Sequence, residues 1–348
     1  MNALPFQARW RREKSAAFDL AANSTAGRTV TLDLWGSART IYANANFSIY
    51  SRQACNAKCH FCVEELRPAS RGRELAMQRT VEQDDEVYFA NLDASLQALK
   101  PLDPSVSITG GEPSKDPRLP RILATSRRRE ARKLTVTTNG SGLLDRHDGK
   151  PLIDWITAAG ARHLNISRAH PEHDANARLM VLKEGLSVGQ LRDVIGAARD
   201  GGTRVRLSCV LIEGQIDSVP RIVEYLRFAR SVGADNVIFR QLMLTDPRTA
   251  APNHVVKYSD RFRARLEPIL DALSEDARFS FQRQIVGYYY YVEVWRFEDI
   301  DVVFEEADLA RLEDTKRREP ELVHELIFHP NARLASTWQP WDGVLGPG

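Results

Sequence analysis

The chain has 348 residues, of which 43% are hydrophobic and 27% are charged, and this apolar content excludes disorder as its main state. Its 48 basic and 46 acidic residues give a net charge of +2, a balance that argues against a nucleic-acid-binding protein. The most apolar windows, such as residues 285–295, are short and interrupted, whereas a membrane span needs about 20 apolar residues. No amino-terminal segment has the apolar core of a signal peptide.

From residue 46 to residue 243, short β-like runs alternate with helical stretches. This alternation predicts parallel strands joined by helical crossovers, in an open, barrel-like sheet or a doubly wound one. The expected strands are 46–52, 105–109, 133–138, 163–168, 204–212 and 236–243, and the expected helices lie near 82–99, 117–130, 151–160, 188–200 and 217–232.

The expected strands have one apolar and one polar face. In the third strand, Leu134 and Val136 alternate with Thr135 and Thr137, and other strands repeat the pattern. A parallel strand that is covered on both faces would be apolar on both. We therefore expect a curved sheet with helices on its apolar face and a polar concave face that lines a substrate-sized cavity. Antiparallel strands with one solvated face are the alternative, which the helical crossovers disfavour.

The segments on either side of the alternating region differ from it. Residues 1–45 are expected to form a leader, with a short hairpin near 30–42. Residues 244–348 are expected to form a β-rich cap, with a helix over 258–273, strands within 279–304 and a strand–turn–strand unit over 326–338. The predicted domains are thus the leader, a core over 46–243 and this cap.

Three of the four cysteines, Cys55, Cys59 and Cys62, fall within eight residues directly after the first strand. Three thiolates on one loop can hold three corners of an iron–sulfur cube and leave one iron open. A zinc knuckle with His60 as a fourth ligand and three unrelated thiols are the alternatives. Clustered rather than dispersed cysteines also indicate a reducing compartment, and we expect a cytoplasmic protein.

A second motif follows the second strand, which runs directly into Gly110, Gly111, Glu112 and Pro113. The two glycines allow the backbone to approach a ligand closely. Glu112 places a carboxylate at the carboxyl end of a strand, where barrel enzymes have their active sites. The alternative is a glycine-rich turn with a solvated glutamate.

The sequence CNAKCHFC after the first strand, together with ITGGEP on the second, resembles the radical S-adenosylmethionine (radical SAM) superfamily over roughly residues 46 to 243. The resemblance implies an α/β fold, a partial (β/α)6 TIM-like barrel. It implies one 4Fe–4S cluster on Cys55, Cys59 and Cys62, with SAM bound to the open iron. It also implies reductive cleavage of SAM to a 5′-deoxyadenosyl radical that takes a hydrogen atom from the substrate, with an electron donor such as flavodoxin or ferredoxin.

The motif positions imply further cofactor contacts. Phe61 corresponds to the aromatic residue near the adenine of SAM, and Gly110, Gly111 and Glu112 to the segment that receives its amino group. Asn139 belongs to a Thr-Asn-Gly sequence near the SAM pocket.

Two further contacts depend on the fourth strand. Ser167 corresponds to a serine that hydrogen-bonds the ribose, but the Ser-Leu-Asp that is common in the family is Ser167-Arg168-Ala169 here. This departure puts the ribose contact of the aspartate in doubt and brings Arg168 close to the cavity mouth. Arg178 is a candidate partner of the SAM carboxylate or, alternatively, a residue of a helix surface.

Several arginines face inward by strand parity, which suggests an anionic or carbonyl-rich substrate, unless they form ion pairs with acidic residues. Cys209 lies on the apolar face of its strand, and we expect it to be a buried small residue rather than a hydrogen-atom donor. The candidate substrate contacts are Tyr50, Arg52, Asn165, Arg168, Arg206, Ser208 and Arg240.

The carboxyl-terminal unit resembles a hairpin that carries further clusters in some relatives, but no cysteine follows Cys209, so we predict no auxiliary cluster. Within the superfamily, the resemblance is to the group with viperin and the molybdenum-cofactor GTP cyclase. It implies hydrogen abstraction from a small polar substrate, such as a nucleotide or sugar, followed by cyclisation or rearrangement. A maturase that crosslinks or epimerises a ribosomal peptide is one alternative, and a non-catalytic iron–sulfur or zinc protein is another.

Overall fold

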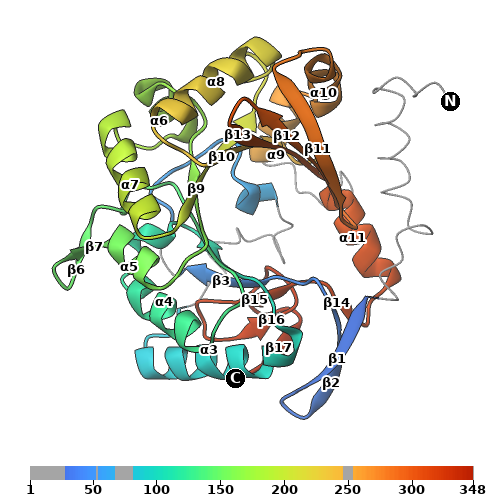
Figure 1. The fold of residues 1–348 in the computed structure, drawn as a ribbon. Coiled ribbons are helices and arrows are strands. Elements are labelled where there is room, and N and C mark those ends of the chain that lie inside the picture. The colour runs from blue at the N-terminus through green and yellow to red at the C-terminus, as the bar shows by residue number, and fades with distance from the viewer. Residues whose placement is uncertain (1–27, 52–53, 67–80, 246–253, 348) are drawn as a thin grey trace.

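The computed structural model describes residues 28–51, 54–66, 81–245 and 254–347. At its centre, six strands lie side by side in chain order, and each pairs in parallel with the next (Figure 1). The predicted α/β fold is therefore confirmed, with every expected strand within two residues of its predicted ends. The strands are β3 (Phe47–Ser51), β4 (Val106–Gly110), β5 (Leu134–Thr138), β8 (His163–Ser167), β9 (Arg204–Leu211) and β10 (Asn236–Gln241).

Helices connect these strands and lie outside the curve of the sheet (Figure 1). Their starts follow from local capping: Asp84 accepts hydrogen bonds from the backbone of Glu86 and Val87, and Ser187 forms a capping box with Gln190. The expected helices are α3 (Asp85–Ala98), α4 (Leu119–Arg128), α5 (Leu152–Ala158), α7 (Val188–Asp200) and α8 (Val219–Ser231), and α6 (His173–Met180) was not expected.

The predicted difference between the two sheet faces is also confirmed. Leu134 and Val136 are buried against the helices, whereas Thr135 and Thr137 on the opposite face are only half-buried. The same alternation holds through β8 and β9. The curved sheet thus packs its apolar face on the helix layer and leaves a polar inner face that solvent reaches.

The carboxyl-terminal segment lengthens this sheet at both edges instead of forming a separate layer. On one side β13 (Ile300–Ala307) pairs in parallel with β10, followed by the antiparallel β12 (Tyr290–Phe297) and β11 (Phe279–Val286). On the other side β15 (Leu326–Phe328) pairs in parallel with β3, followed by β16 (Leu334–Ala335) and β17 (Val344–Gly346). The expected β-rich segment and hairpin are present, while the domain boundaries at 45 and 243 stay a prediction.

The helix expected over 258–273 is two helices, α9 (His254–Phe262) and α10 (Leu266–Ser274). The chain breaks between them because Arg263 forms a β-bridge with Ile212 and its guanidinium donates to the carbonyl oxygens of Leu242 and Met243, both at 2.8 Å. A further helix, α11 (Leu309–Arg318), follows β13.

A small second sheet packs beside the large one. It contains the expected hairpin, β1 (Thr29–Leu34) and β2 (Ser37–Tyr42), with β14 (Leu322–Val323) beside β2, and a separate short hairpin consists of β6 (Arg146–His147) and β7 (Lys150–Pro151). The ring of Tyr288, just before β12, packs on Tyr42 at 5.4 Å and on His324 at 5.1 Å. These contacts join the β11–β12 edge of the large sheet to the small sheet. None of the described helices combines the length and apolarity needed to cross a bilayer.

Candidate active site

The cysteine loop lies between the carboxyl end of β3 and the short 3-10 helix η1 (Val63–Leu66). Cys55 is exposed, while Cys59 and Cys62 are half-buried. The Cys59 thiol donates to the carbonyl oxygen of Met180 at 3.3 Å, and the backbone of Lys58 donates to the same oxygen at 3.3 Å. The carboxyl end of α6 therefore holds the middle of the loop.

The surroundings of the thiols fit an iron–sulfur cluster. Burial raises the pKa of Cys59, and the negative charges of Cys62 and Cys55 raise it further, so the three thiols lie close enough to interact. Cys59 and Phe61 also pack against an apolar group that includes Ala169 and Met180. Three clustered thiols with one apolar wall suit a cationic cluster that compensates their charge and releases their protons.

The zinc-knuckle alternative receives no support from His60. Its ring stacks on Tyr258 of α9 at 5.5 Å. Within the described ranges, no three His, Cys, Asp or Glu side chains are arranged around the position of a single metal ion.

Glu112 follows β4 and is almost completely buried, at 1% exposure. Its Oε1 accepts hydrogen bonds from the backbone and hydroxyl of Ser114, at 2.9 and 2.6 Å, and from the Thr138 hydroxyl. Its Oε2 accepts from the backbone of Asn139 at 2.7 Å. Burial raises the pKa of Glu112, while the hydrogen bonds from Ser114 and Thr138 oppose that rise. The alternative of a solvated turn glutamate is therefore wrong.

Asn139 links the Glu112 network to the cysteine loop. Its amide nitrogen donates to the side-chain oxygen of Asn56 at 2.8 Å and lies 3.8 Å from the sulfur of Cys55. Gly110 allows β3 and β4 to meet closely at the same edge, because it has φ +119° and a Cβ there would lie 2.7 Å from the backbone nitrogen of Ser51. The structure thus brings together the two motifs that the sequence singled out, and Gly111 of the second motif is half-buried.

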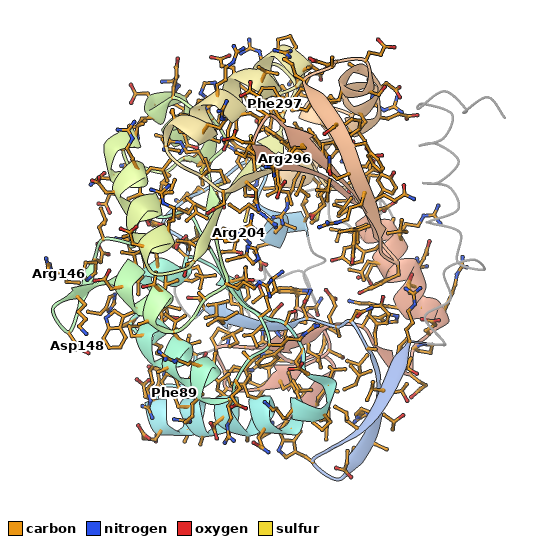
Figure 2. All side chains as sticks on the ribbon, viewed as in Figure 1. Phe89, Arg146, Asp148, Arg204, Arg296 and Phe297 are labelled. Carbon is orange, nitrogen blue, oxygen red and sulfur yellow. The ribbon has the colours of Figure 1, made fainter. Side chains whose placement is uncertain are left out.

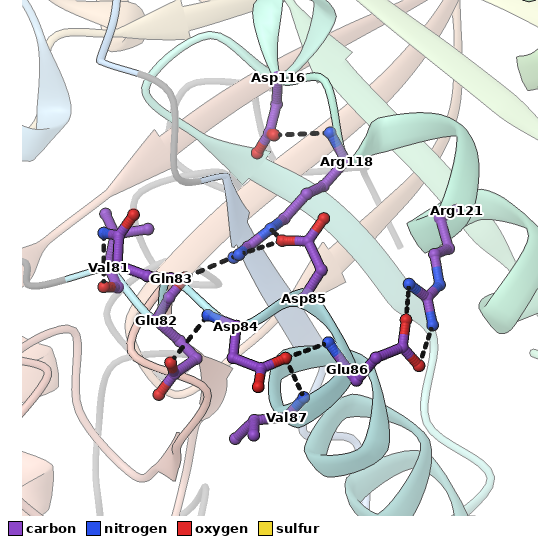
Figure 3. Close-up of polar contacts among 10 residues, drawn as sticks. All are labelled: Val81, Glu82, Gln83, Asp84, Asp85, Glu86, Val87, Asp116, Arg118 and Arg121. Atoms are coloured by element: carbon purple, nitrogen blue, oxygen red, sulfur yellow. Dashed lines mark hydrogen bonds and ion pairs between the residues drawn. The ribbon is translucent and has the colours of Figure 1, made fainter.

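A buried arginine supports the strand that leads into the cysteine loop (Figure 3). Arg118 donates to the carboxylate of Asp85 at 2.7 Å and to the carbonyl oxygen of Glu82 at 2.6 Å. Its backbone donates to Asp116 at 2.9 Å, and Asp116 also accepts from the hydroxyl of Ser51, the last residue of β3, at 2.9 Å. The start of the loop is therefore tied to the start of α4 through Asp116 and, through Arg118, to the start of α3.

The remaining expected SAM contacts lie at the same edge of the sheet. Ser167 ends β8 and is half-buried, and it pairs in register with Ser208 of β9. Phe61 is half-buried beside Cys59. Arg178 is exposed on α6, the helix that anchors the loop. The assignment of these residues to particular SAM groups stays a prediction.

Arg168 differs from its expected place at the cavity mouth. It is 3% exposed, and its guanidinium donates to the carbonyl oxygens of His170, Leu186 and Pro171 at 2.8–3.0 Å. Its own carbonyl accepts from the Tyr225 hydroxyl at 2.6 Å. Arg168 therefore stabilises the loop after β8 through these carbonyl oxygens. It has this structural role instead of the expected contact with the substrate.

Replacing Arg168 with lysine should destabilise the protein by about 2–4 kcal/mol, because one ammonium cannot reach three carbonyl oxygens at once. Urea unfolding of Arg168→Lys measures this loss, with Arg227→Lys on the exposed face of α8 as the matched control. An unchanged unfolding midpoint together with lost turnover would instead restore a role in substrate binding.

Two substrate candidates have protein partners. The Tyr50 hydroxyl donates to Glu64 at 3.1 Å, and its ring packs edge-on against Trp338 at 6.2 Å. Arg240 pairs with Glu305 at 3.1 Å, so the alternative of an ion pair holds for this arginine. The sequence did not indicate these partners, because they come from distant parts of the chain. Glu64 belongs to η1, Glu305 to β13 and Trp338 to the carboxyl-terminal hairpin.

The other candidates face inward or are buried. The Arg206 guanidinium donates to Asn236 at 2.7 Å, and the Asn165 amide donates to Thr137 at 3.2 Å. Cys209 has no exposed surface and belongs to the apolar core, as expected. Arg52 lies outside the described residues.

Comparisons with known proteins agree with this site. The family model described as the Radical SAM superfamily matches residues 49–226. The chain is 25% identical to the GTP 3',8-cyclase of Aquifex aeolicus (strain VF5) in an alignment of 180 residues. This alignment covers 51% of each chain. It is 28% identical to the GTP 3',8-cyclase of Stenotrophomonas maltophilia (strain K279a) in an alignment of 229 residues. This alignment covers 64% of this chain and 60% of that relative. The chain thus spans between half and two thirds of these relatives.

Among solved structures, SuiB from Streptococcus suis bound to the precursor peptide SuiA shares the fold. The TM-score is 0.50 at 13% sequence identity, over 85% of this chain and 60% of that chain. The family match covers the cysteine loop, the Glu112 network, the end of β3 and the whole of β4, β5, β8 and β9. The chain belongs to the radical SAM superfamily, whose enzymes use a 4Fe–4S cluster and SAM as cofactors.

Proposed function

We propose that this enzyme abstracts a hydrogen atom from a small polar metabolite, such as a nucleotide or sugar, and that the substrate radical then cyclises or rearranges. With an electron from a donor such as flavodoxin or ferredoxin, the cluster and SAM supply the 5′-deoxyadenosyl radical for this step. Cys55, Cys59 and Cys62 hold the cluster, and Glu112 and Asn139 shape the adjacent SAM site. A cytoplasmic location belongs to the same proposal.

The polar inner face of the sheet carries this proposal. Asn165 pairs in register with Thr137 on one side and Arg206 on the other, and Ser167 pairs with Ser208. All five side chains are half-buried, so hydrogen-bonding groups of adjacent strands remain accessible in the interior. Such a surface suits a ligand rich in hydroxyl, carbonyl or phosphate groups. The GTP 3',8-cyclases among the relatives support a small-molecule substrate over a peptide.

The protein's own residues orient the reaction. Glu64 holds the Tyr50 ring against Trp338, which fixes an aromatic wall beside the cysteine loop. Cys209 stays buried behind β9, so it does not serve as the hydrogen-atom donor of an epimerase.

Cleavage of SAM in separate substrate pools tests the proposal. The protein is reconstituted without oxygen, reduced with dithionite in the presence of SAM, and assayed for 5′-deoxyadenosine. We expect slow cleavage alone and faster cleavage with a pool of nucleotides and sugar phosphates. No 5′-deoxyadenosine from protein with an intact cluster would contradict the proposal, and stimulation by a ribosomal precursor peptide alone would favour a maturase.

A further inference from the structure

A group of basic side chains lies at the end of the barrel opposite the cysteine loop. Lys133 immediately precedes β5, His163 begins β8, and Arg204 begins β9, whereas the cysteines and Glu112 follow the carboxyl ends of their strands. Figure 2 shows Arg204 reaching from β9 toward the space that the sheet curves around. Arg206, two residues further along β9, lies on the same inner face.

Positive charge exceeds negative charge on this inner face. Asp301 contacts Arg296 at 2.6 Å and Arg204 at 3.9 Å, and Glu305 contacts Arg240. Within the described ranges, neither Lys133 nor Arg206 forms an ion pair. Five cations thus face two carboxylates: Lys133, Arg204, Arg206, Arg240 and Arg296 against Asp301 and Glu305.

Two polar atoms beside these cations are buried without a hydrogen-bond partner in the described part of the chain. They are Nδ1 of His163 and Oδ1 of Asn165. A buried polar atom without a partner is unfavourable, so native proteins rarely leave one unpaired without a reason. A ligand whose anionic oxygens accept from His163, Lys133 and Arg206, and whose hydroxyl group donates to Oδ1 of Asn165, would satisfy both atoms and the excess of positive charge.

We infer that Lys133, His163 and Arg206 form a subsite for a phosphoryl group of the substrate. A phosphoryl group carries up to two negative charges per phosphorus, which matches the excess of cations better than a single carboxylate does. That the group belongs to the substrate rests on the proposed function, whereas the subsite itself does not depend on SAM.

The length of the strands limits the size of the substrate. His163 and Ser167 are four residues apart on β8, which corresponds to roughly 13 Å at 3.3 Å per residue. A substrate whose phosphoryl group lies against His163 must therefore extend about that far to reach the SAM site. This span suits a phosphorylated sugar or a nucleotide in an extended conformation.

Calorimetric titration of the reconstituted, full-length protein with inorganic pyrophosphate tests the subsite. Lys133→Gln and Arg206→Gln should each weaken pyrophosphate binding by about tenfold or more, because each removes a charged hydrogen-bond donor. Arg132→Gln is the matched control, because it removes the same charge from the residue next to Lys133. The side chain of Arg132 lies beside Asp103 and Ser105. Acetate should bind far more weakly than pyrophosphate.

A second measurement uses the unmodified protein, so it does not depend on the folding of any variant. Burial, Lys133 and Arg206, together with Arg204 and Arg162, lower the pKa of His163 to about 4. A bound anion favours the protonated imidazole, so pyrophosphate should raise this pKa in an NMR titration, with His163→Asn used to assign the signal.

Failure of this inference is distinguishable from failure of the proposed function. No pyrophosphate binding by protein that cleaves SAM would overturn the subsite alone, as would equal losses in Arg132→Gln and the two test variants. Pyrophosphate binding that depends on Lys133 and Arg206, in protein that never yields 5′-deoxyadenosine, would support the subsite and overturn the proposed function.

Discussion

Replacement of Cys59 by alanine is expected to abolish assembly of the iron–sulfur cluster and to reduce 5′-deoxyadenosine formation to background. Cys59 is the central thiol of the loop, and α6 fixes its position through the carbonyl oxygen of Met180. Two remaining thiols cannot hold three corners of a cube. Iron and sulfide analysis, together with the visible absorbance of the reconstituted variant, measures the loss.

Cys209→Ala is the matched control for that experiment. Cys209 is fully buried in the apolar core on the outer face of β9. The variant should retain its full iron content and lose about 1 kcal/mol of stability from the small cavity. A complete cluster in Cys59→Ala, iron loss in Cys209→Ala, or zinc in oxygen-protected wild-type protein would contradict the ligand assignment.

Replacement of Glu112 by glutamine is expected to destabilise the protein by about 1–3 kcal/mol and to weaken SAM binding by tenfold or more. The backbone N–H groups of Ser114 and Asn139 donate to different carboxylate oxygens. A glutamine has only one acceptor atom at these two positions, so one backbone N–H must face an NH2 group in either orientation. The loss of negative charge also removes the expected partner of the SAM ammonium.

Chemical unfolding and SAM titration of the Glu112→Gln variant separate these two effects. Glu86→Gln is the control, because Glu86 is exposed on α3 and pairs with Arg121 at the surface (Figure 3). It should change neither stability nor SAM binding appreciably. Wild-type SAM affinity in Glu112→Gln would show that the carboxylate only supports the fold.

The parallel core was predictable because its signal is local. Most of the six strands have a period-two pattern of apolar residues, and helical stretches separate them, so the order of the sheet follows from chain order. The same rule places the residues after β4 and β5 at one edge, which agrees with the positions of Glu112 and Asn139. Asn139 itself was expected near the SAM pocket only from the family resemblance.

Other features depend on contacts that no local pattern carries. Helix α6 was missed because its sequence, HDANARLM, has no clear apolar stripe, and it is fixed by its contacts with the cysteine loop. Arg168 was expected at the cavity mouth because it directly follows Ser167, but its partners are the carbonyl oxygens of His170 and Pro171 in its own loop and of Leu186. The ion pair of Arg240 with Glu305 required knowledge that β13 adds to the sheet edge.

The pairing of β15 with β3 has a consequence for how the protein is made. Leu326 lies beside Phe47, so one edge of the barrel stays open until the ribosome has synthesised the chain through β15. During translation, β3 presents an unpaired edge that can associate with other nascent chains. Contacts between such distant parts of a sequence also form slowly. Production in a heterologous host should therefore benefit from slower synthesis and abundant chaperones, whereas a version that ends before β15 should accumulate as insoluble material.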